Sequence, residues 1–268
     1  LRGVAAFGGD AASHKALAGL YAVTKRPRKA LEEYGRALDR APQDAEAALA
    51  LAQLHRQLGD RAAAERVLRD LLRHAPAQLQ ASTMLAGLLR AGGRNAAAVA
   101  CLEQAVAASP KSPRAHTELG ALYQFGGRFD EAEREYRQAL KLNDRYVPAY
   151  NNLAYLYEHQ RREPEMAERM ARAAADAAPT NGHCLDTLGW IVLRRGRAAE
   201  AIDPLERAHR YLPNSPSIAY HLGAAYAEIG AAEPARTVLS RALASREAFP
   251  ERASCEKLLK RLGTDGRP

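Results

Sequence analysis

The pair His183-Cys184 comes nearest to a chemical site in this sequence. Imidazole and thiolate groups bind transition metals, and together they can also form a base and a nucleophile. On a helix, a further partner would stand three or four residues away, and those places hold Asp186, Thr187 and Leu188. Asp186 could join His183, but two ligands are too few for a metal site. The sequence therefore predicts no catalytic residue, metal or cofactor here.

Sequence motifs for disulfides, zinc binding and catalysis are also missing. The three cysteines, Cys101, Cys184 and Cys255, lie far apart and form no Cys-x-x-Cys pair, which argues against a disulfide framework or a zinc site. We expect them to be small buried residues. No GxGxxG, P-loop, HExxH or GxSxG pattern occurs. We expect that the chain is not an enzyme, and an enzymatic role would need a domain outside these residues.

The composition indicates which elements must position any site. Alanine, leucine, arginine and glutamate are abundant, and these residues favour helix, so we expect an all-α protein. The net charge of +8 could attract nucleic acid, acidic glycan or acidic proteins. Because no block of five or six like charges occurs, we expect dispersed, solvated charges instead. No apolar run is long enough to span a membrane, and a signal peptide preceding Leu1 would lie outside the chain.

A period of 34 residues runs through the sequence. Pro42, Pro76 and Pro110 are spaced by 34 residues, and so are Pro179 and Pro213. Four alanines and six pairs of leucine with a small residue keep the same spacing, with one additional residue near 160–166. The alanines are Ala30, Ala64, Ala98 and Ala132, and the pairs begin at Leu17, Leu51, Leu85, Leu119, Leu188 and Leu222. A fixed period of this length indicates a repeat architecture.

This pattern resembles the tetratricopeptide repeat family, most clearly in HTELGALYQFGGRFDEAEREYRQALKLN at residues 116–143. The resemblance implies a right-handed superhelical solenoid of helical hairpins with a concave groove lined by the first helix of each repeat. We expect a lead-in at 1–10, a capping helix at 250–262 and a frayed tail at 263–268. The repeats are expected at 11–44, 45–78, 79–112, 113–146, 147–181, 182–215 and 216–249.

Several local features follow from this division. Glycines 59, 127, 196 and 230 fall where first helices end, where a positive φ is expected. Gly120, Gly189 and Gly223 are expected to let two helices approach closely. Pro204 lies inside a second helix and predicts a kink. His14 and His116 take core places, and the additional residue of HQRREPEM is expected in the turn between two helices.

The family's groove positions predict a surface that binds a peptide or protein partner. The first three repeats place small or polar residues there, whereas later repeats place aromatic side chains beside amides and charges, as peptide binding requires. Tyr155, Trp190 and Tyr220 either bind a partner or pack against adjacent helices, and the sequence leaves both open. The predicted groove residues are Arg114, Gln124, Phe125, Asn151, Asn152, Tyr155, Asp186, Trp190, Arg194, Tyr220 and His221.

Two specialisations of the family do not fit. A clamp for two carboxylates would need basic residues on the helices that flank Asn152, and these are missing. An asparagine ladder would need asparagine at the equivalent places of other repeats, and only Asn152 stands there. The groove residues vary from repeat to repeat, which argues against RNA binding by a base-reading array.

The leading hypothesis is thus a non-catalytic scaffold for protein–protein interaction. NNLAYLYE at 151–158, LDTLGWIVLRRGRAAEA at 185–201 and IAYHLGAAYAEIG at 218–230 resemble bacterial envelope proteins of exopolysaccharide export and of exosortase-type systems. That resemblance implies partners among export components and favours the periplasm or cell envelope over the cytoplasm. The alternatives are a helical repeat protein that binds RNA or acidic glycan, and the docking portion of a larger enzyme.

Overall fold

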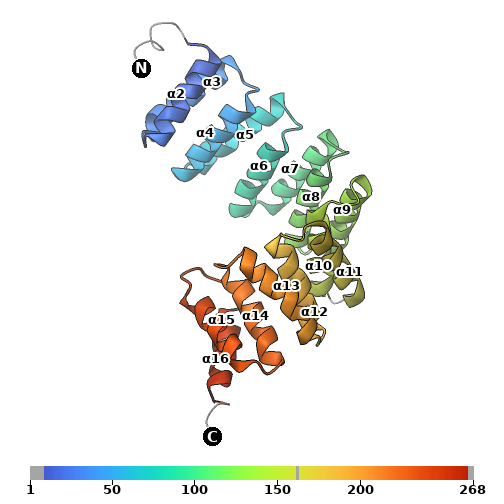
Figure 1. Ribbon diagram of the computed structural model, residues 1–268. Helices are drawn as coiled ribbons and strands as arrows, with labels where there is room; N and C mark the ends of the chain where they lie inside the picture. The colour runs from blue at the N-terminus through green and yellow to red at the C-terminus, as the bar shows by residue number, and fades with distance from the viewer. Residues whose placement is uncertain (1–8, 161–162, 265–268) are drawn as a thin grey trace. The chain divides into compact units, whose positions relative to one another are not determined.

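The computed structural model describes residues 9–160 and 163–264, and it is helical throughout these ranges, without a strand. The all-α prediction is therefore confirmed for the described residues. The chain divides into two compact units, Leu1–Glu135 and Tyr136–Pro268, and the division falls within α9 (Phe129–Leu142). In each unit the helices follow one another as antiparallel hairpins (Figure 1).

Unit 1 holds three complete hairpins and α8, and each helix packs against the next one from α2 to α8. Its helices are α2 (Ala11–Val23), α3 (Pro27–Arg40), α4 (Ala45–Gln57), α5 (Arg61–His74), α6 (Leu79–Ala91), α7 (Asn95–Ala108) and α8 (Pro113–Phe125).

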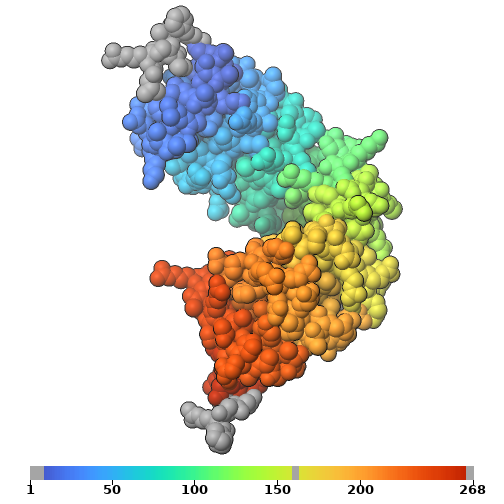
Figure 2. Space-filling model, viewed as in Figure 1, coloured from blue at the N-terminus to red at the C-terminus, as the bar shows by residue number. Residues whose placement is uncertain are grey.

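Unit 2 holds three further hairpins and a terminal helix, again packed in chain order. These are α10 (Val147–Gln160), α11 (Pro164–Ala177), α12 (Gly182–Arg194), α13 (Ala198–Tyr211), α14 (Pro216–Glu228), α15 (Ala232–Ala244) and α16 (Arg252–Thr264). Within each unit the side chains fill the spaces between neighbouring ribbons (Figure 2).

The helix bounds follow the 34-residue period, and we keep the seven-repeat division as a proposal. In that division, α2 and α3 form the first repeat and later pairs follow in order. The terminal helix α16 begins two residues later than expected and extends two residues further. α10 has 14 residues, one more than each of the other first helices, and the turn in which the additional residue is expected includes residues 161–162, which lie outside the described residues. So do most of the lead-in (1–8) and of the tail (265–268).

The core is built from small residues that recur with the repeat. Ala30, Ala64, Ala98 and Ala132 have no exposed surface. His14 and His116 are buried as predicted, and their Nδ1 atoms lie 2.6 Å from Glu33 and Glu135. Gly189 and Gly223 let the two helices of a hairpin approach closely, as predicted, because an added Cβ would lie 2.5 Å from Leu205 and 2.6 Å from Leu239.

Glycine has a conformational role at the end of first helices. Residues 59, 127, 196 and 230 have positive φ as predicted, and Gly93 adopts the same conformation. In the first repeat that place is held by Lys25, whose φ is 56°. A lysine in the left-handed region carries backbone strain that glycine does not. Pro204 lies within α13, which continues past it, and the kink at this residue stays a prediction.

We expect Lys25→Gly to stabilise unit 1 by about 0.5–1 kcal/mol. Relief of left-handed strain is worth roughly 1–2 kcal/mol, and the greater freedom of an unfolded glycine removes part of it. Chemical denaturation followed by circular dichroism measures the change. Gly59→Lys is the reciprocal control, because it places lysine at a φ of 84° with open space around the added Cβ. Stabilisation by both substitutions would contradict this explanation.

Candidate functional site

The predicted groove residues lie on four first helices. Arg114, Gln124 and Phe125 are on α8 in unit 1, and the other eight are on α10, α12 and α14 in unit 2. In unit 1, the Phe125 side chain is 60% exposed and the guanidinium of Arg90 lies 4.5 Å from its ring centroid. Arg114 is exposed, with Nε 4.0 Å from a carboxylate oxygen of Glu118. These side chains lie on a largely solvated surface.

In unit 2 three predicted residues form an aromatic cluster, which consists of Trp190, Tyr220 and His221. The Trp190 and His221 rings stack with centroids 4.1 Å apart and an interplanar angle of 24°. The Tyr220 ring is tilted against both, at 6.0 Å from Trp190 and 5.7 Å from His221. The cluster joins α12 to α14, so residues from two repeats build one surface.

Polar side chains hold this cluster in place. His221 is buried, and its Nδ1 lies 2.8 Å from Oδ1 of Asp186. The Arg194 guanidinium lies 6.0 Å from the Trp190 ring centroid and 3.5 Å from Glu158 on α10. Asp186 thus holds His221, whose ring stacks on Trp190.

Two cavities meet at Trp190 and Arg194, which line both of them. The smaller cavity, of about 370 Å³, lies among α10, α12 and α14 and is also lined by Tyr155, Asp186 and His221. The larger cavity, of about 730 Å³, lies among α12, α14 and α16 and is also lined by Tyr220. We call them the small and the large cavity.

The structure addresses whether the aromatic residues pack or are accessible. Trp190 and Tyr220 are half-buried and pack against the hydrophobic core of unit 2, while they also line a cavity. Burial raises the pKa of the Tyr220 hydroxyl. Tyr155 is 58% exposed. Packing and accessibility therefore coexist at these positions.

Two of the eight predicted residues in unit 2 lie outside both cavities. Asn151 and Asn152 are half-buried on α10, and the Asn151 Oδ1 atom is buried without a hydrogen-bond partner. Sequence reasoning also missed residues that line the large cavity, namely Lys257, Leu258 and Lys260 of α16. The amphipathic pattern of residues 250–262 is the available signal, whereas the sequence analysis predicts only a capping helix there.

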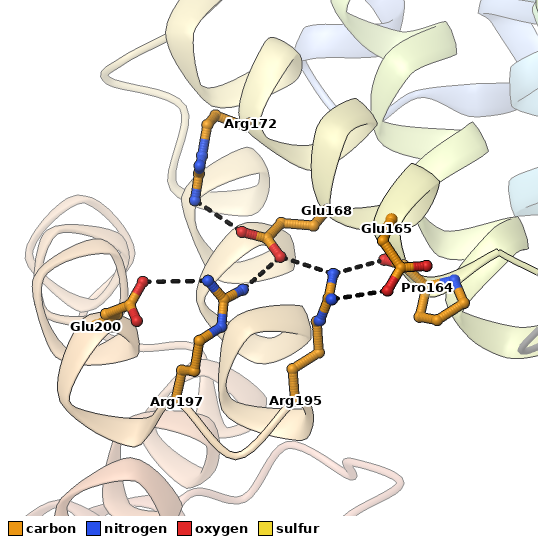
Figure 3. A network of polar contacts seen from close by, with 7 residues as sticks. All are labelled: Pro164, Glu165, Glu168, Arg172, Arg195, Arg197 and Glu200. Atoms are coloured by element: carbon orange, nitrogen blue, oxygen red, sulfur yellow. Dashed lines mark hydrogen bonds and ion pairs between the residues drawn. The ribbon is translucent and has the colours of Figure 1, made fainter.

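A buried carboxylate positions α12 against α11. Glu168, whose side chain is 10% exposed, contacts Arg172 on its own helix and two arginines of the turn after α12 (Figure 3). Its oxygens lie 2.8 Å from Arg172 Nη2 and 2.9 Å from Arg195 Nη1, and Arg197 also donates to it. Arg195 reaches Glu165 as well. The network fixes the end of the helix that carries Trp190.

The same arrangement occurs three repeats earlier with one arginine fewer. Glu65 contacts Arg69 on its own helix and Arg94 in the turn after α6. The pKa of Glu65 is lowered, first because Arg94 hydrogen-bonds to its carboxylate. The repeated glutamate thus ties a second helix to the following repeat in both units.

The side chains of His183 and Cys184 lie in different environments. Cys184 is buried, which raises the pKa of its thiol, and His183 is exposed. Cys255 is also buried as expected, whereas Cys101 is partly exposed, contrary to that expectation, because it lies at a groove between helices. Across residues 9–160 and 163–264, no three His, Cys, Asp or Glu side chains are grouped to hold a metal ion. None of the helices in these ranges has the length and apolarity to cross a membrane.

Comparison with known families gives two matching models, both described as tetratricopeptide repeat. One matches residues 15–78 and 49–113, and the other matches residues 89–154 and 192–259. Comparison with curated protein sequences gives no match.

Solved structures of other proteins share the fold. A tetratricopeptide repeat protein from Parabacteroides merdae has a TM-score of 0.66 at 16% identity, over 94% of this chain and 98% of that one. The pilF protein of Pseudomonas aeruginosa has a TM-score of 0.57 at 21% identity, over 70% and 89%. PilW, described as a widely conserved type IV pilus biogenesis factor, has a TM-score of 0.59 at 21% identity, over 79% and 96%. At these identities the similarity concerns the fold alone.

Proposed function

The chain belongs to the tetratricopeptide repeat family, and we propose that it is a non-catalytic scaffold that binds a peptide segment of a protein partner at the two cavities of unit 2. Tetratricopeptide repeats serve in general as scaffolds for protein–protein interaction, and such proteins are generally non-catalytic. The proposal for this chain adds the place of binding and the chemistry of the bound segment.

The observation that carries the proposal is the shared wall of the two cavities. Trp190 and Arg194 line both, so one aromatic ring and one guanidinium adjoin two neighbouring hollows. The stack on His221 already restricts the Trp190 ring, so little side-chain entropy remains to be lost on binding. Rigid aromatic side chains at the centre of a concave surface are typical anchors of peptide binding.

The charges that line the two cavities indicate how a bound segment would be oriented. The large cavity is lined by four basic residues, Arg194, Lys257, Lys260 and Arg261, and by one acidic residue, Glu228. The small cavity is lined by three acidic residues, Glu158, Asp186 and Glu251, together with Arg194. A segment with acidic residues on one side of an apolar anchor and a basic residue on the other would match both. We propose that its acidic side lies in the large cavity.

We further propose that the partner is a component of a bacterial envelope assembly, such as polysaccharide export. The motifs at 151–158, 185–201 and 218–230 support this context because they resemble those of envelope repeat proteins. The fold similarity to the type IV pilus biogenesis factor is compatible with a role in assembly.

Selection from a random peptide library displayed on phage tests the site without a known partner. We expect enriched peptides to carry an apolar anchor flanked by acidic residues on one side. Tyr155→Ala should weaken the selected peptides about tenfold (about 1.4 kcal/mol), because an exposed aromatic wall of the small cavity is lost. Fluorescence anisotropy of labelled peptides measures the dissociation constants.

Tyr211→Ala is the matched control, because Tyr211 is 45% exposed on α13 and lines neither cavity. The helical circular dichroism and the thermal midpoint of both variants should equal those of the unmodified protein. An equal loss of binding in both variants, or enriched peptides without an apolar anchor, would count against the proposed site.

A further inference from the structure

A second concave surface lies in unit 1, among α5, α6 and α7. Its volume is about 1040 Å³, and we call it the α5–α7 groove. Two second helices of neighbouring repeats form its walls, and Leu85 and Leu89 of α6 lie at its floor. Both leucines are buried, so the floor is continuous with the hydrophobic core.

Unit 2 contains a cavity at the equivalent repeat positions, and the comparison shows what is particular to the α5–α7 groove. That cavity lies among α11, α12 and α13 and has a volume of about 290 Å³. Its wall carries Glu200 and Asp203 where the α5–α7 groove has Ala97 and Ala100. Replacing two acidic side chains by methyl groups leaves more open space along α7.

The lining of the α5–α7 groove is also more positively charged than that of the unit 2 cavity. Arg73 lines the α5–α7 groove, whereas the equivalent residue in the unit 2 cavity is the acidic Asp176. Five arginines and two acidic residues line the α5–α7 groove. The cavity in unit 2 is lined by two arginines and three acidic residues. The α5–α7 groove therefore has a net positive charge, whereas the equivalent cavity in unit 2 does not.

Not all of this positive charge is neutralised within the protein. Glu65 pairs with Arg94 and Arg69, and Asp70 pairs with Arg73. Within the part of the chain that the structure describes, Arg61 and Arg66 have no carboxylate within ion-pair distance. Two guanidinium groups at the mouth of an apolar groove remain available for an anionic partner.

We infer that the α5–α7 groove is a second docking site, and that its occupant is an acidic amphipathic helix of a protein partner. The exposed arginines match acidic side chains, and the apolar floor matches an apolar stripe at helical spacing. Nucleic acid and acidic glycan would satisfy the arginines but present no apolar side chains to Leu85, Leu89 and Leu72. The site is separate from the cavities of unit 2 and has its own ligand class.

The probe is a fluorescein-labelled peptide of leucine, alanine and glutamate, with leucine along one helical face and glutamate along both flanks. Anisotropy is measured with the full chain at low and at physiological salt. The comparison probes are a peptide of the same composition with the apolar stripe scrambled, polyglutamate, and single-stranded DNA. We expect the amphipathic peptide to bind at least tenfold more tightly than each of these, because only it offers both kinds of contact.

Charge variants with a matched control locate the binding. Arg66→Gln with Arg73→Gln should weaken the amphipathic peptide about tenfold at low salt. Arg134 and Lys141 occupy the same repeat positions on α9 and are also exposed. Arg134→Gln with Lys141→Gln removes the same net charge outside the groove, so binding should be unchanged.

Two further measurements report on the groove itself. Ala97→Glu with Ala100→Asp copies the residues of the unit 2 cavity onto exposed positions of α7 and should abolish binding while preserving helicity. Cys101 lines the groove and is the partly exposed cysteine, since Cys184 and Cys255 are buried. Bound peptide should therefore slow its alkylation at alkaline pH several-fold.

The outcomes separate this site from the one proposed in unit 2. Tyr155→Ala should leave binding of the amphipathic peptide unchanged, even if it abolishes binding of library peptides. The inference is overturned if the amphipathic peptide does not bind, or if polyglutamate or DNA binds as tightly. It is also overturned if the α9 control loses as much affinity as the groove variant, or if bound peptide leaves Cys101 alkylation unchanged.

Discussion

Glu168→Gln should destabilise unit 2 by about 2–3 kcal/mol. The substitution leaves Arg172, Arg195 and Arg197 around a neutral amide, so three positive charges lose their common partner (Figure 3). Removing one member of a buried ion pair costs roughly 3–5 kcal/mol. We expect less here, because the arginine side chains are 27–54% exposed and water screens part of the repulsion.

Trp190 makes the measurement specific to unit 2, because it is the only tryptophan in the chain. Denaturation followed by its fluorescence reports the region that the network supports, whereas circular dichroism averages over both units. Glu165→Gln is the matched control, since Glu165 contacts the same Arg195 but is 74% exposed. It should change stability by less than about 0.5 kcal/mol. Equal effects of the two substitutions would show that burial of Glu168 has no particular importance.

Gly189→Ala should destabilise unit 2 by about 2 kcal/mol and alter the environment of the adjacent Trp190. A Cβ at position 189 would lie 2.5 Å from Leu205 Cγ and 3.3 Å from the carbonyl oxygen of Ala201. Leu205 is fully buried, so it cannot move aside without disturbing the core. Overpacking of this kind typically costs about 1–3 kcal/mol, which exceeds the gain of roughly 1 kcal/mol in helix propensity.

Gly87→Ala is the matched control, because it gains helix propensity without overpacking. Its change in stability should therefore have the opposite sign. Gly87 lies inside α6, is exposed, and has no heavy atom within 4 Å of an added Cβ. Only the propensity gain applies there, so the variant should be more stable by about 1 kcal/mol in circular dichroism melts. A stabilising Gly189→Ala would show that the two helices do not approach as closely as the structure indicates.

The sequence by itself determined the helices and the turns between them. A 34-residue period, small residues at fixed places, and a glycine after most first helices are local signals, because each depends on one helix or one turn. The positive φ at Gly59 and its equivalents, the burial of His14 and His116, and the all-helical fold follow from them. Lys25 shows the limit of such signals, since the chain adopts the glycine conformation there without glycine.

The tertiary structure decided which side chains meet between repeats. The period does not show that His221 stacks on Trp190, that α16 lines the large cavity, or that Glu168 contacts arginines beyond the next helix. Nor does it show that Ala97 and Ala100 leave the α5–α7 groove open where Glu200 and Asp203 narrow the equivalent cavity. These features depend on helix spacing and side-chain rotamers across repeats, which only packing in three dimensions determines.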